Sequence, residues 1–294
     1  MNHMNVNLFV VGAMKAGTTS LIEILSNHSE IYVPPIKEPH FFVDTLPKSL
    51  YEPSRFFNLD KYFKEEFPKP IHISKIEDIS QYKKLYSLST NEKYCVDAST
   101  AYLHAPGVVQ KIYSYNEDAK IIILLRDPLK RAFSHYKMDV GLGRINASFD
   151  QLMEKEIQEY NNGSLQWSSH IGMSLYKNAI ENYTSLFKDV LVLRIEDLAS
   201  RKNEELSKIS SFLGIKDFET STILHKNVAR EPKFKKLFYF LKQMGIKDYF
   251  SKYLSSNFRH WLFKKTTKDS TFKMEITPKN LEKLNAIFIK ESKL

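Results

Sequence analysis

The segment that most constrains the fold runs from Phe9 to Leu25 and reads FVVGAMKAGTTSLIEIL. An apolar run that can be buried on both faces leads into a glycine-rich turn, and an amphipathic helix follows. Backbone N–H groups at such a turn point outward, and the dipole of the following helix adds partial positive charge, so we predict an anion-binding site. The alternative is an ordinary tight turn in which glycine supplies only a positive φ.

The order of residues in this turn differs from that of an ATPase P-loop. The P-loop pattern ends in Gly-Lys-Ser/Thr, whereas Lys15 comes two residues before Gly17, and Thr18 and Thr19 follow. Lys15 can supply a point charge with three donors, and the threonines can supply hydroxyl groups. The turn therefore predicts an anion held differently from ATP.

A second turn follows the most apolar segment of the chain, residues 121–125. We predict a buried strand there, a turn at 126–128 and a helix over 129–138. The carboxyl ends of parallel strands lie at one edge of a sheet, so both turns should lie at the edge where such sheets bind ligands.

Arg126 in the second turn and Ser134 two helical turns further on can hold a phosphate, one through its guanidinium fork and the other through its hydroxyl. Alternatively, Arg126 pairs with Asp127 or caps the helix, and Ser134 is a plain surface serine. Two separate anion grips favour a ligand with two separated phosphates over the contiguous triphosphate of ATP.

Strands and helices alternate along the rest of the chain, which predicts one α/β domain over 1–294 with a P-loop-like parallel sheet flanked by helices. Three prolines within 34–39 exclude a regular helix there. The region between the helix after Arg126 and Tyr176 looks irregular. Further expected elements are a strand at 94–100, a helix from Pro106, a helix at 176–187, a strand at 189–198 and a helix at 203–215 closed by Gly214.

The composition indicates an anionic ligand but does not choose one. The net charge is +9 and the pI about 9.2, which suits an acidic small molecule, a glycan, nucleic acid or a membrane surface. Residues 230–268 are basic and aromatic, and we expect amphipathic helices that cover the core; the alternative is a surface for peripheral membrane contact or an acidic acceptor.

The single cysteine, Cys95, excludes an intrachain disulfide and suits a reducing compartment, where we expect it as a buried apolar filler. No apolar run approaches the roughly 20 residues that span a bilayer, so we expect a cytoplasmic protein. No His/Cys cluster with metal-ligand spacing is visible, and we expect no metal.

Three motifs in order, GAMKAGTTSL, KEPHFF and LLRDPLKRAFSHY, resemble those of the sulfotransferases that use 3′-phosphoadenosine 5′-phosphosulfate (PAPS). The similarity is greatest to the heparan-sulfate-type and bacterial carbohydrate branch. The later segments VLVLRIEDL, FLGI and NVAREP also fall in the order that this family shows.

The resemblance implies how PAPS would bind. The first turn would hold the 5′-phosphosulfate, with Lys15 on the bridging oxygen, and Arg126 and Ser134 would hold the 3′-phosphate that ATP lacks. The Lys-Gly-Arg loop that heparan-type relatives close over PAPS has no clear counterpart in this chain. We expect residues 226–236 to replace it, with Arg230 or Lys233 near the nucleotide. The turn residues implied as donors to the phosphosulfate are Lys15, Ala16, Gly17, Thr18, Thr19 and Ser20.

The resemblance also implies that Glu38 is the general base and that Lys37, His40 and Asp97 face the acceptor. His40 is the alternative base. Positive neighbours would lower the pKa of Glu38 and burial would raise it, so the sequence leaves its direction open. The bland alternative is a surface ion pair between Glu38 and Lys37, with His40 packed among aromatic side chains.

One departure from the heparan-type pattern concerns the acceptor. Those enzymes have Glu-Lys-(Ser/Thr)-Pro-x-Tyr where this chain has Asp97-Ala98-Ser99-Thr100-Ala101-Tyr102, so the lysine that would touch an acidic acceptor is missing. We expect a carbohydrate, glycolipid or small-molecule acceptor and no nucleic acid. The competing functions are an Mg-ATP-dependent kinase, with Asp97 arguable as its metal-binding acid, and a non-catalytic polyanion-binding module.

Overall fold

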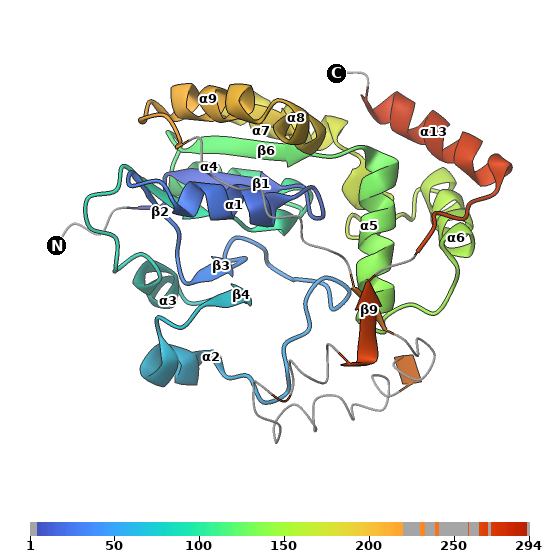
Figure 1. Cartoon of the computed structure of the whole chain (residues 1–294), viewed down its shortest axis with the longest axis horizontal. Coiled ribbons are helices and arrows are strands. Elements are labelled where there is room, and N and C mark those ends of the chain that lie inside the picture. The colour runs from blue at the N-terminus through green and yellow to red at the C-terminus, as the bar shows by residue number, and fades with distance from the viewer. Residues whose placement is uncertain are drawn as a thin grey trace.

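The computed structural model describes residues 5–219, 230–232, 239–240, 258, 265–269 and 272–292. Its centre is a five-stranded parallel sheet in the order β2-β5-β1-β6-β7 (Figure 1). The predicted α/β class and parallel sheet are thus confirmed. The strands are β1 (Leu8–Gly12), β2 (Ile31–Tyr32), β5 (Tyr94–Asp97), β6 (Lys120–Leu125) and β7 (Val190–Arg194).

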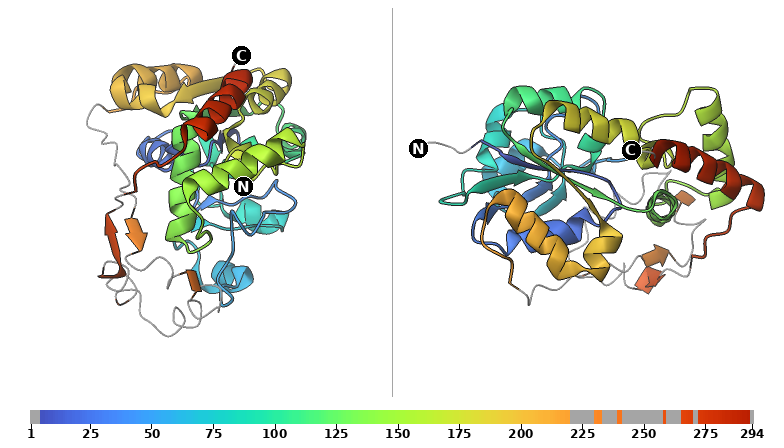
Figure 2. Two further views of the ribbon diagram at one scale, coloured as in Figure 1. Left: turned by 90° about the vertical axis from the view of Figure 1, so that its right-hand side faces the viewer. Right: turned by 90° about the horizontal axis from the view of Figure 1, so that it is seen from above.

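Helices cover both faces of this sheet, as right-handed crossovers between parallel strands require. Seen from above in Figure 2, α1 (Thr18–Ser26) and α9 (Lys202–Leu213) lie on one face, and α4 (Val108–Tyr115) and α7 (Lys177–Leu186) lie on the other. Every residue of β1 is buried, because this strand has neighbours on both sides and helices on both faces.

A second hydrophobic cluster lies beyond the carboxyl edge of the sheet, between α5 (Pro128–Gly141), α6 (Phe149–Asn161) and α13 (Pro278–Ser292). The three helices stand together to one side of the sheet in Figure 1. The prediction of an irregular region before Tyr176 is wrong over α6. The missed signal is the capping box in which Ser148 and Gln151 exchange hydrogen bonds at the helix start.

The proline-rich segment is not helical, as predicted, and it adds a short strand outside the main sheet. β3 (Ile36–Glu38) pairs in parallel with β4 (Ile71–Ile73) below the sheet in Figure 1. Short helical elements fill the segment around β4: α2 (Leu59–Lys61), η1 (Tyr62–Glu66) and α3 (Ile79–Lys84).

Several boundaries differ from the prediction. The helix expected from Pro106 begins at Val108 after Gly107, and the strand expected over 189–198 ends at Arg194, where α8 (Ile195–Ser200) begins. Gly214 closes α9 with a positive φ of 60°, as expected. Two 3-10 turns complete the connections: η2 (Thr100–Leu103) and η3 (Gly172–Ser174).

The expected amphipathic helices and membrane-facing surface of 230–268 lie largely outside the described residues. Within that stretch, β8 (Arg230–Pro232) pairs with β9 (Thr267–Asp269) in antiparallel register, and β8 lies beside α5. Among the residues that the structure describes, no helix combines the length and the apolar character that crossing a membrane would require.

Candidate active site

The glycine-rich turn joins β1 to α1 and has the backbone of an anion-binding loop. Lys15 and Gly17 both have positive φ, 69° and 96°, and α1 begins at Thr18. The N–H groups of the first turn of a helix have no acceptor inside the helix, so those of Thr18 and Thr19 are open to a ligand. The turn is therefore shaped as the sequence predicted.

Two glycines let this turn pack against its neighbours. A Cβ at Gly17 would lie 2.7 Å from Ile195 Cδ1, and a Cβ at Gly12 would lie 2.9 Å from Leu103 Cβ and 3.1 Å from the Thr100 carbonyl oxygen. Gly12 thus brings the end of β1 against η2, which also contacts Glu38. The anion-binding turn and the proposed base are built on one continuous packing surface.

Arg126 lies at the end of β6 and reaches the first turn, since its Nη1 donates to the Lys15 carbonyl oxygen over 3.1 Å. The alternative that Arg126 pairs with Asp127 is not what the structure shows, because Asp127 caps α5 by accepting from the N–H of Lys130. The predicted meeting of the two turns at one sheet edge is confirmed.

The Lys15 side chain is largely enclosed and faces α5. In the described part of the chain its ammonium group has the Met138 thioether as acceptor, at 3.7 Å. Burial lowers the pKa of Lys15, and the nearby Arg126 lowers it further, while Asp139 and Glu38 act in the opposite sense. A thioether is a weak acceptor, so the ammonium group can still turn to an anionic ligand.

Sequence reasoning missed Arg131, which holds the turn from behind. Its side chain is fully buried and donates to the Met14 carbonyl at 3.4 Å, the Ser174 hydroxyl at 2.6 Å and the His170 carbonyl at 2.5 Å. Burial lowers its pKa to about 10, so it remains charged at neutral pH. Arg131 therefore ties α5, η3 and the turn together.

Ser134 lies half-buried on α5. Its side-chain hydroxyl makes no hydrogen bond within the described part of the chain. Lys137, one turn further on, shares its helix face. Burial lowers the pKa of Lys137, and the charge of Arg126 lowers it further, which places the two cations near each other. Sequence reasoning did not identify Lys137 as a partner of Arg126 and Ser134, although its i,i+3 spacing from Ser134 was a visible signal.

Glu38, at the end of β3, is buried and contacts four side chains. Oε1 accepts from Lys37 Nζ at 2.7 Å and lies 3.7 Å from His72 Nε2. Oε2 accepts from the Thr100 hydroxyl at 2.7 Å and the Thr100 N–H at 3.3 Å, and lies 3.5 Å from His40 Nε2. The ion pair with Lys37 exists, but it is buried and not the surface pair of the bland alternative.

The structure resolves the direction of the Glu38 pKa that the sequence left open. Burial acts to raise it, but the charge of Lys37 and the hydrogen bond to His40 together outweigh burial, so the pKa lies far below its usual range. Glu38 is therefore a carboxylate throughout the physiological range and is able to accept a proton.

His40, the alternative base, is buried among aromatic side chains and has a positive φ of 47°. Its ring lies edge-on to Tyr102, with the centroids 6.1 Å apart, and its backbone N–H donates a hydrogen bond to the Ser99 hydroxyl oxygen at 2.9 Å. His40 thus flanks Glu38 on the closed side of the carboxylate.

Asp97 was predicted to face the acceptor, but its side chain is fully buried. Oδ2 accepts from Tyr82 and Tyr102, each at 2.9 Å, and Oδ1 accepts from the hydroxyl and N–H of Ser99 at 2.6 and 3.1 Å. Four protein donors leave no position for an acceptor or a Mg²⁺ ion. In this structure Asp97 fixes the loop that carries Ser99 and Thr100.

Arg230 lies in β8, beside α5, and so on the side of the molecule that carries Ser134. Its side chain and Lys233 lie outside the described residues. Cys95 is buried on β5, as expected of an apolar filler.

The sequence showed no His/Cys cluster with metal-ligand spacing, but the fold forms one candidate cluster from distant segments. The fold brings His135, Asp139 and His170 together behind the Lys15 turn, with one ligand atom of each within 4.8 Å of the others. The sequence could have shown only the His135–Asp139 half, because His170 comes from a separate segment.

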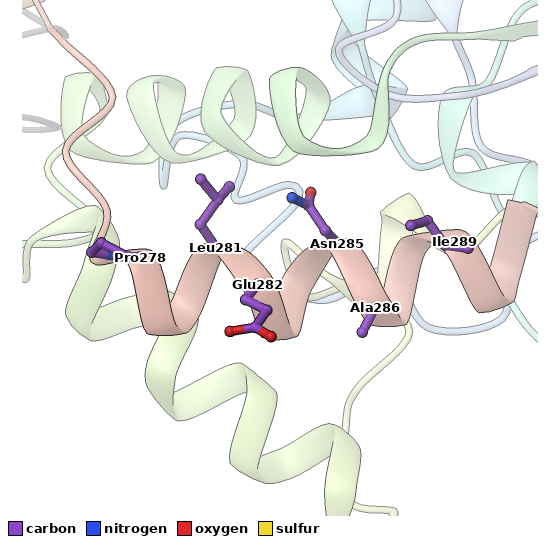
Figure 3. A pocket seen from close by; sticks show the side chains of 6 residues that line it. All are labelled: Pro278, Leu281, Glu282, Asn285, Ala286 and Ile289. Carbon is purple, nitrogen blue, oxygen red and sulfur yellow. The ribbon is translucent and has the colours of Figure 1, made fainter.

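A surface depression lies on α13 and is apart from this site. Figure 3 shows its lining along one helix, and none of these residues belongs to the two turns or to β3. The lining residues are Pro278, Leu281, Glu282, Asn285, Ala286 and Ile289.

The fold and the site together define a class: an α/β protein whose glycine-rich turn, at the carboxyl edge of a parallel sheet, has a geometry that suits an anionic ligand. Residues 7–220 match the model of the sulfotransferase family, and the chain belongs to this family. The resemblance carried by the three sequence motifs is thereby confirmed.

Individual relatives agree with this assignment. The chain is 23% identical over 247 residues to carbohydrate sulfotransferase 15 of Mus musculus, which covers 71% of this chain and 44% of the relative. It is 23% identical over 220 residues to heparan sulfate glucosamine 3-O-sulfotransferase 3B1 of Homo sapiens, covering 74% and 48% respectively. The chain spans about half the length of these curated relatives.

Among solved structures, the chain is similar to the sulfotransferase from Alicyclobacillus acidocaldarius. The TM-score is 0.60 and the sequence identity 30%, and the match covers 83% of this chain and 93% of that one. The match covers most of this chain and nearly all of that one, which supports the α/β fold class.

Proposed function

We propose that this protein transfers a sulfuryl group from PAPS to a hydroxyl or amine of a carbohydrate or glycolipid-type acceptor and releases 3′,5′-ADP. The observation that carries the proposal is the contact between Arg126 and the Lys15 carbonyl. This contact puts two cationic grips side by side at one sheet edge, where a nucleotide with phosphates on two ribose positions can reach both.

The donor would lie with its 5′-phosphosulfate on the glycine-rich turn. The N–H groups of Thr18 and Thr19 and the hydroxyls of the 18–20 segment would donate to its oxygens. Arg126, Ser134 and Lys137 would hold the 3′-phosphate, because they cluster where α5 leaves the sheet. Arg230 is a further candidate from β8.

Lys15 would stabilise the leaving group. When the bond between sulfur and the bridging oxygen breaks, its electron pair stays on the 5′-phosphate, which gains negative charge. An ammonium group held in a largely buried site stabilises such charge more strongly than one in water. Lys15 has this burial, and its weak thioether partner can be given up without much cost.

Glu38 would take the proton of the acceptor as the acceptor oxygen or nitrogen forms its bond to sulfur. Oε2 is fixed by Thr100, whereas Oε1 faces the more open side, where the His72 side chain is 62% exposed. We infer that the acceptor approaches Oε1 from the side of His72 and displaces part of its contact with Lys37. Losing that positive neighbour raises the basicity of Glu38 when the proton must be taken.

The carbohydrate class of acceptor is supported by the names of the relatives, which are sulfotransferases of carbohydrate and heparan sulfate. Lys37 and the newly found His72 lie at Glu38 Oε1 and are the proposed acceptor-facing residues, whereas His40 lies at Oε2 on the closed side. A cytoplasmic location, with or without peripheral membrane contact through 230–268, remains part of the proposal.

A thermal-shift comparison tests the donor. The protein should be stabilised by several degrees with saturating 3′,5′-ADP, and less by ADP, because only the former engages both grips. Addition of Mg²⁺ should not reverse this order. A larger shift with Mg-ATP would favour the kinase, and salt-sensitive shifts without nucleotide preference would favour the polyanion-binding module.

A further inference from the structure

Two histidines and an aspartate form a buried cluster directly behind the Lys15 turn. His135 and Asp139 lie one helical turn apart on the same face of α5, and His170 comes from the segment before η3. Their exposed fractions are 1%, 2% and 5%. The cluster lies next to Met138, the residue that contacts the ammonium group of Lys15.

The three side chains lie close together but do not satisfy one another's hydrogen-bonding groups. Asp139 Oδ2 lies 3.5 Å from His135 Nε2 and 3.2 Å from His170 Nε2. Neither contact has the geometry of a hydrogen bond: both nitrogens of His135, and Nε2 of His170, are buried without a hydrogen-bond partner in the described part of the chain. Buried polar groups are seldom left this way, so the arrangement calls for a missing partner.

We propose that His135 Nε2, Asp139 Oδ2 and His170 Nε2 bind a divalent transition-metal ion of the zinc class. In a tetrahedral site with metal–ligand bonds of 2.0–2.1 Å, neighbouring ligand atoms lie about 3.3–3.4 Å apart. The two distances from Asp139 fall on either side of this value. In such a site each nitrogen lone pair points at the ion and not at the neighbouring ligand, which accounts for the unsatisfied contacts.

Surrounding residues orient the ligands as metal sites require. Glu156 Oε1 lies 2.8 Å from His170 Nδ1 and would accept a hydrogen bond from its N–H. This tautomer leaves the lone pair of Nε2 directed toward the ion. Glu156 is itself held by the N–H groups of His170 and Ile171. Arg144 donates to Asp139 Oδ1 at 3.1 Å, which leaves Oδ2 for the ion.

Charges of both signs surround the cluster, and the two negative ones contact its histidines directly. Asp139 and Glu156 supply two negative charges, whereas Lys15, Arg131 and Arg144 oppose a further cation. His170 lies between the carboxylates of Asp139 and Glu156, at 3.2 and 2.8 Å, and this position favours a positive charge.

The ion would act as a structural tie. It would join α5 to the segment before η3, next to the place where Arg131 makes the same connection through Ser174 and the His170 carbonyl. The cluster does not contact the proposed donor or acceptor atoms, so its test does not depend on the proposed reaction.

The test uses the untagged full-length protein, stripped with a chelator, passed through a desalting column and titrated with Zn²⁺ or Co²⁺. We expect about one equivalent of tightly held metal, a rise in Tm on addition, and visible absorption bands of four-coordinate Co²⁺. His135→Leu and Asp139→Asn should each lower the retained metal at least tenfold. His104→Gln is the matched control, because His104 is a half-buried histidine whose Nδ1 is likewise buried without a partner in the described part of the chain, but it lies outside the cluster.

X-ray absorption on the wild-type protein decides the case even if the variants fold poorly, because it counts two imidazoles in the zinc shell and no sulfur. A stripped protein that neither retains metal nor changes Tm with Zn²⁺ or Co²⁺ would overturn the proposal, and the cluster would then be a protonated His170 between two carboxylates. Metal retained equally by His135→Leu, or a shell with fewer than two imidazoles, would overturn it as well.

Discussion

At the scale of single residues, Glu38 shows how neighbours set the state of a buried acid. Burial alone would favour the neutral carboxylic acid, yet Lys37, His40 and Thr100 hold the charged form. The consequence is a carboxylate that is always deprotonated; in the proposed mechanism it is a weak base until an acceptor displaces one of its partners.

The hydrogen bond from Thr100 should matter for turnover. Thr100→Val removes the hydroxyl that fixes Glu38 Oε2 at 2.7 Å but leaves the N–H at 3.3 Å, so we expect kcat to fall about tenfold, from a loss of roughly 1.5 kcal/mol for a hydrogen bond to a charged group. Thr100→Ser keeps the hydroxyl and should retain most of the rate. Both should bind 3′,5′-ADP as the wild type does in calorimetry.

Glu38→Gln is the reference for this experiment, since it should abolish transfer and leave 3′,5′-ADP binding nearly intact. Retained turnover in Glu38→Gln would remove Glu38 from the role of base. An unchanged kcat in Thr100→Val would show that the hydrogen bond from Thr100 to Glu38 Oε2 does not contribute to turnover.

The pH dependence of kcat/KM separates the two candidate bases. The folded-state pKa of Glu38 is depressed, so Glu38 stays ionised, and its stabilising contacts persist, as pH falls from 8 to the ordinary carboxyl range of about 4.3. We expect no acid limb from the base above that range. An acid limb above that range that disappears in His40→Gln would instead assign the proton transfer to His40.

At the scale of elements, the turn before α1 depends on close approach. Gly17 has a φ of 96°, and any Cβ there meets Ile195 at the start of α8. The sequence indicates the glycine-rich turn, but the reason for this particular glycine lies in α8, about 180 residues away along the chain.

Gly17→Ala should therefore lower stability by about 1–3 kcal/mol through backbone strain and the contact with Ile195. It should weaken 3′,5′-ADP binding at the same time, because the N–H groups of the turn move. Urea unfolding and calorimetry would measure the two effects. Gly163→Ala is the control: Gly163 also has a positive φ, but a Cβ there meets nothing within 4 Å, so ligand binding should be unchanged. Equal losses of binding in both variants would contradict this account.

At the scale of the whole molecule, the site depends on α13, the last described helix. Its inner face completes the cluster around α5 and α6 through Leu284, Ile287 and Phe288. α5 carries Arg131, Ser134 and Lys137. We therefore expect the packing of α13 in the cluster that includes α5 to stabilise the two proposed phosphate-binding positions as well.

Leu284→Ala should cost about 2–4 kcal/mol in the free energy of unfolding, because Leu284 is fully buried. It should also weaken 3′,5′-ADP binding as α5 loses support. Ile289→Ala on the same helix is the matched control, because that side chain is 58% exposed, and it should change stability by less than about 1 kcal/mol. Denaturant titration measures both, and similar costs would show that α13 does not support α5 in this way.

The sequence by itself determined the local elements that rest on short-range physics. The apolar run before Gly12 forms β1, the run 121–125 lies within β6, and the turns after them lie at the same sheet edge because parallel strands leave no other choice. Lys15 and Arg126 were visible for the same reason, since each lies in a turn that follows a recognisable strand, whereas Glu38 was implied only by the resemblance to the family. The class of fold follows from the alternation of these elements.

Only the tertiary structure decided how distant segments meet. Arg131 and His72 contact partners on other elements, Asp97 is enclosed by tyrosines from two segments, and His170 joins His135 and Asp139 from a separate segment. The direction of the Glu38 pKa also required the folded molecule, because burial and charge oppose each other and their balance depends on distances of a few ångströms. Local patterns encode elements, whereas burial and long-range contact, which no window of sequence contains, set the chemistry of the site.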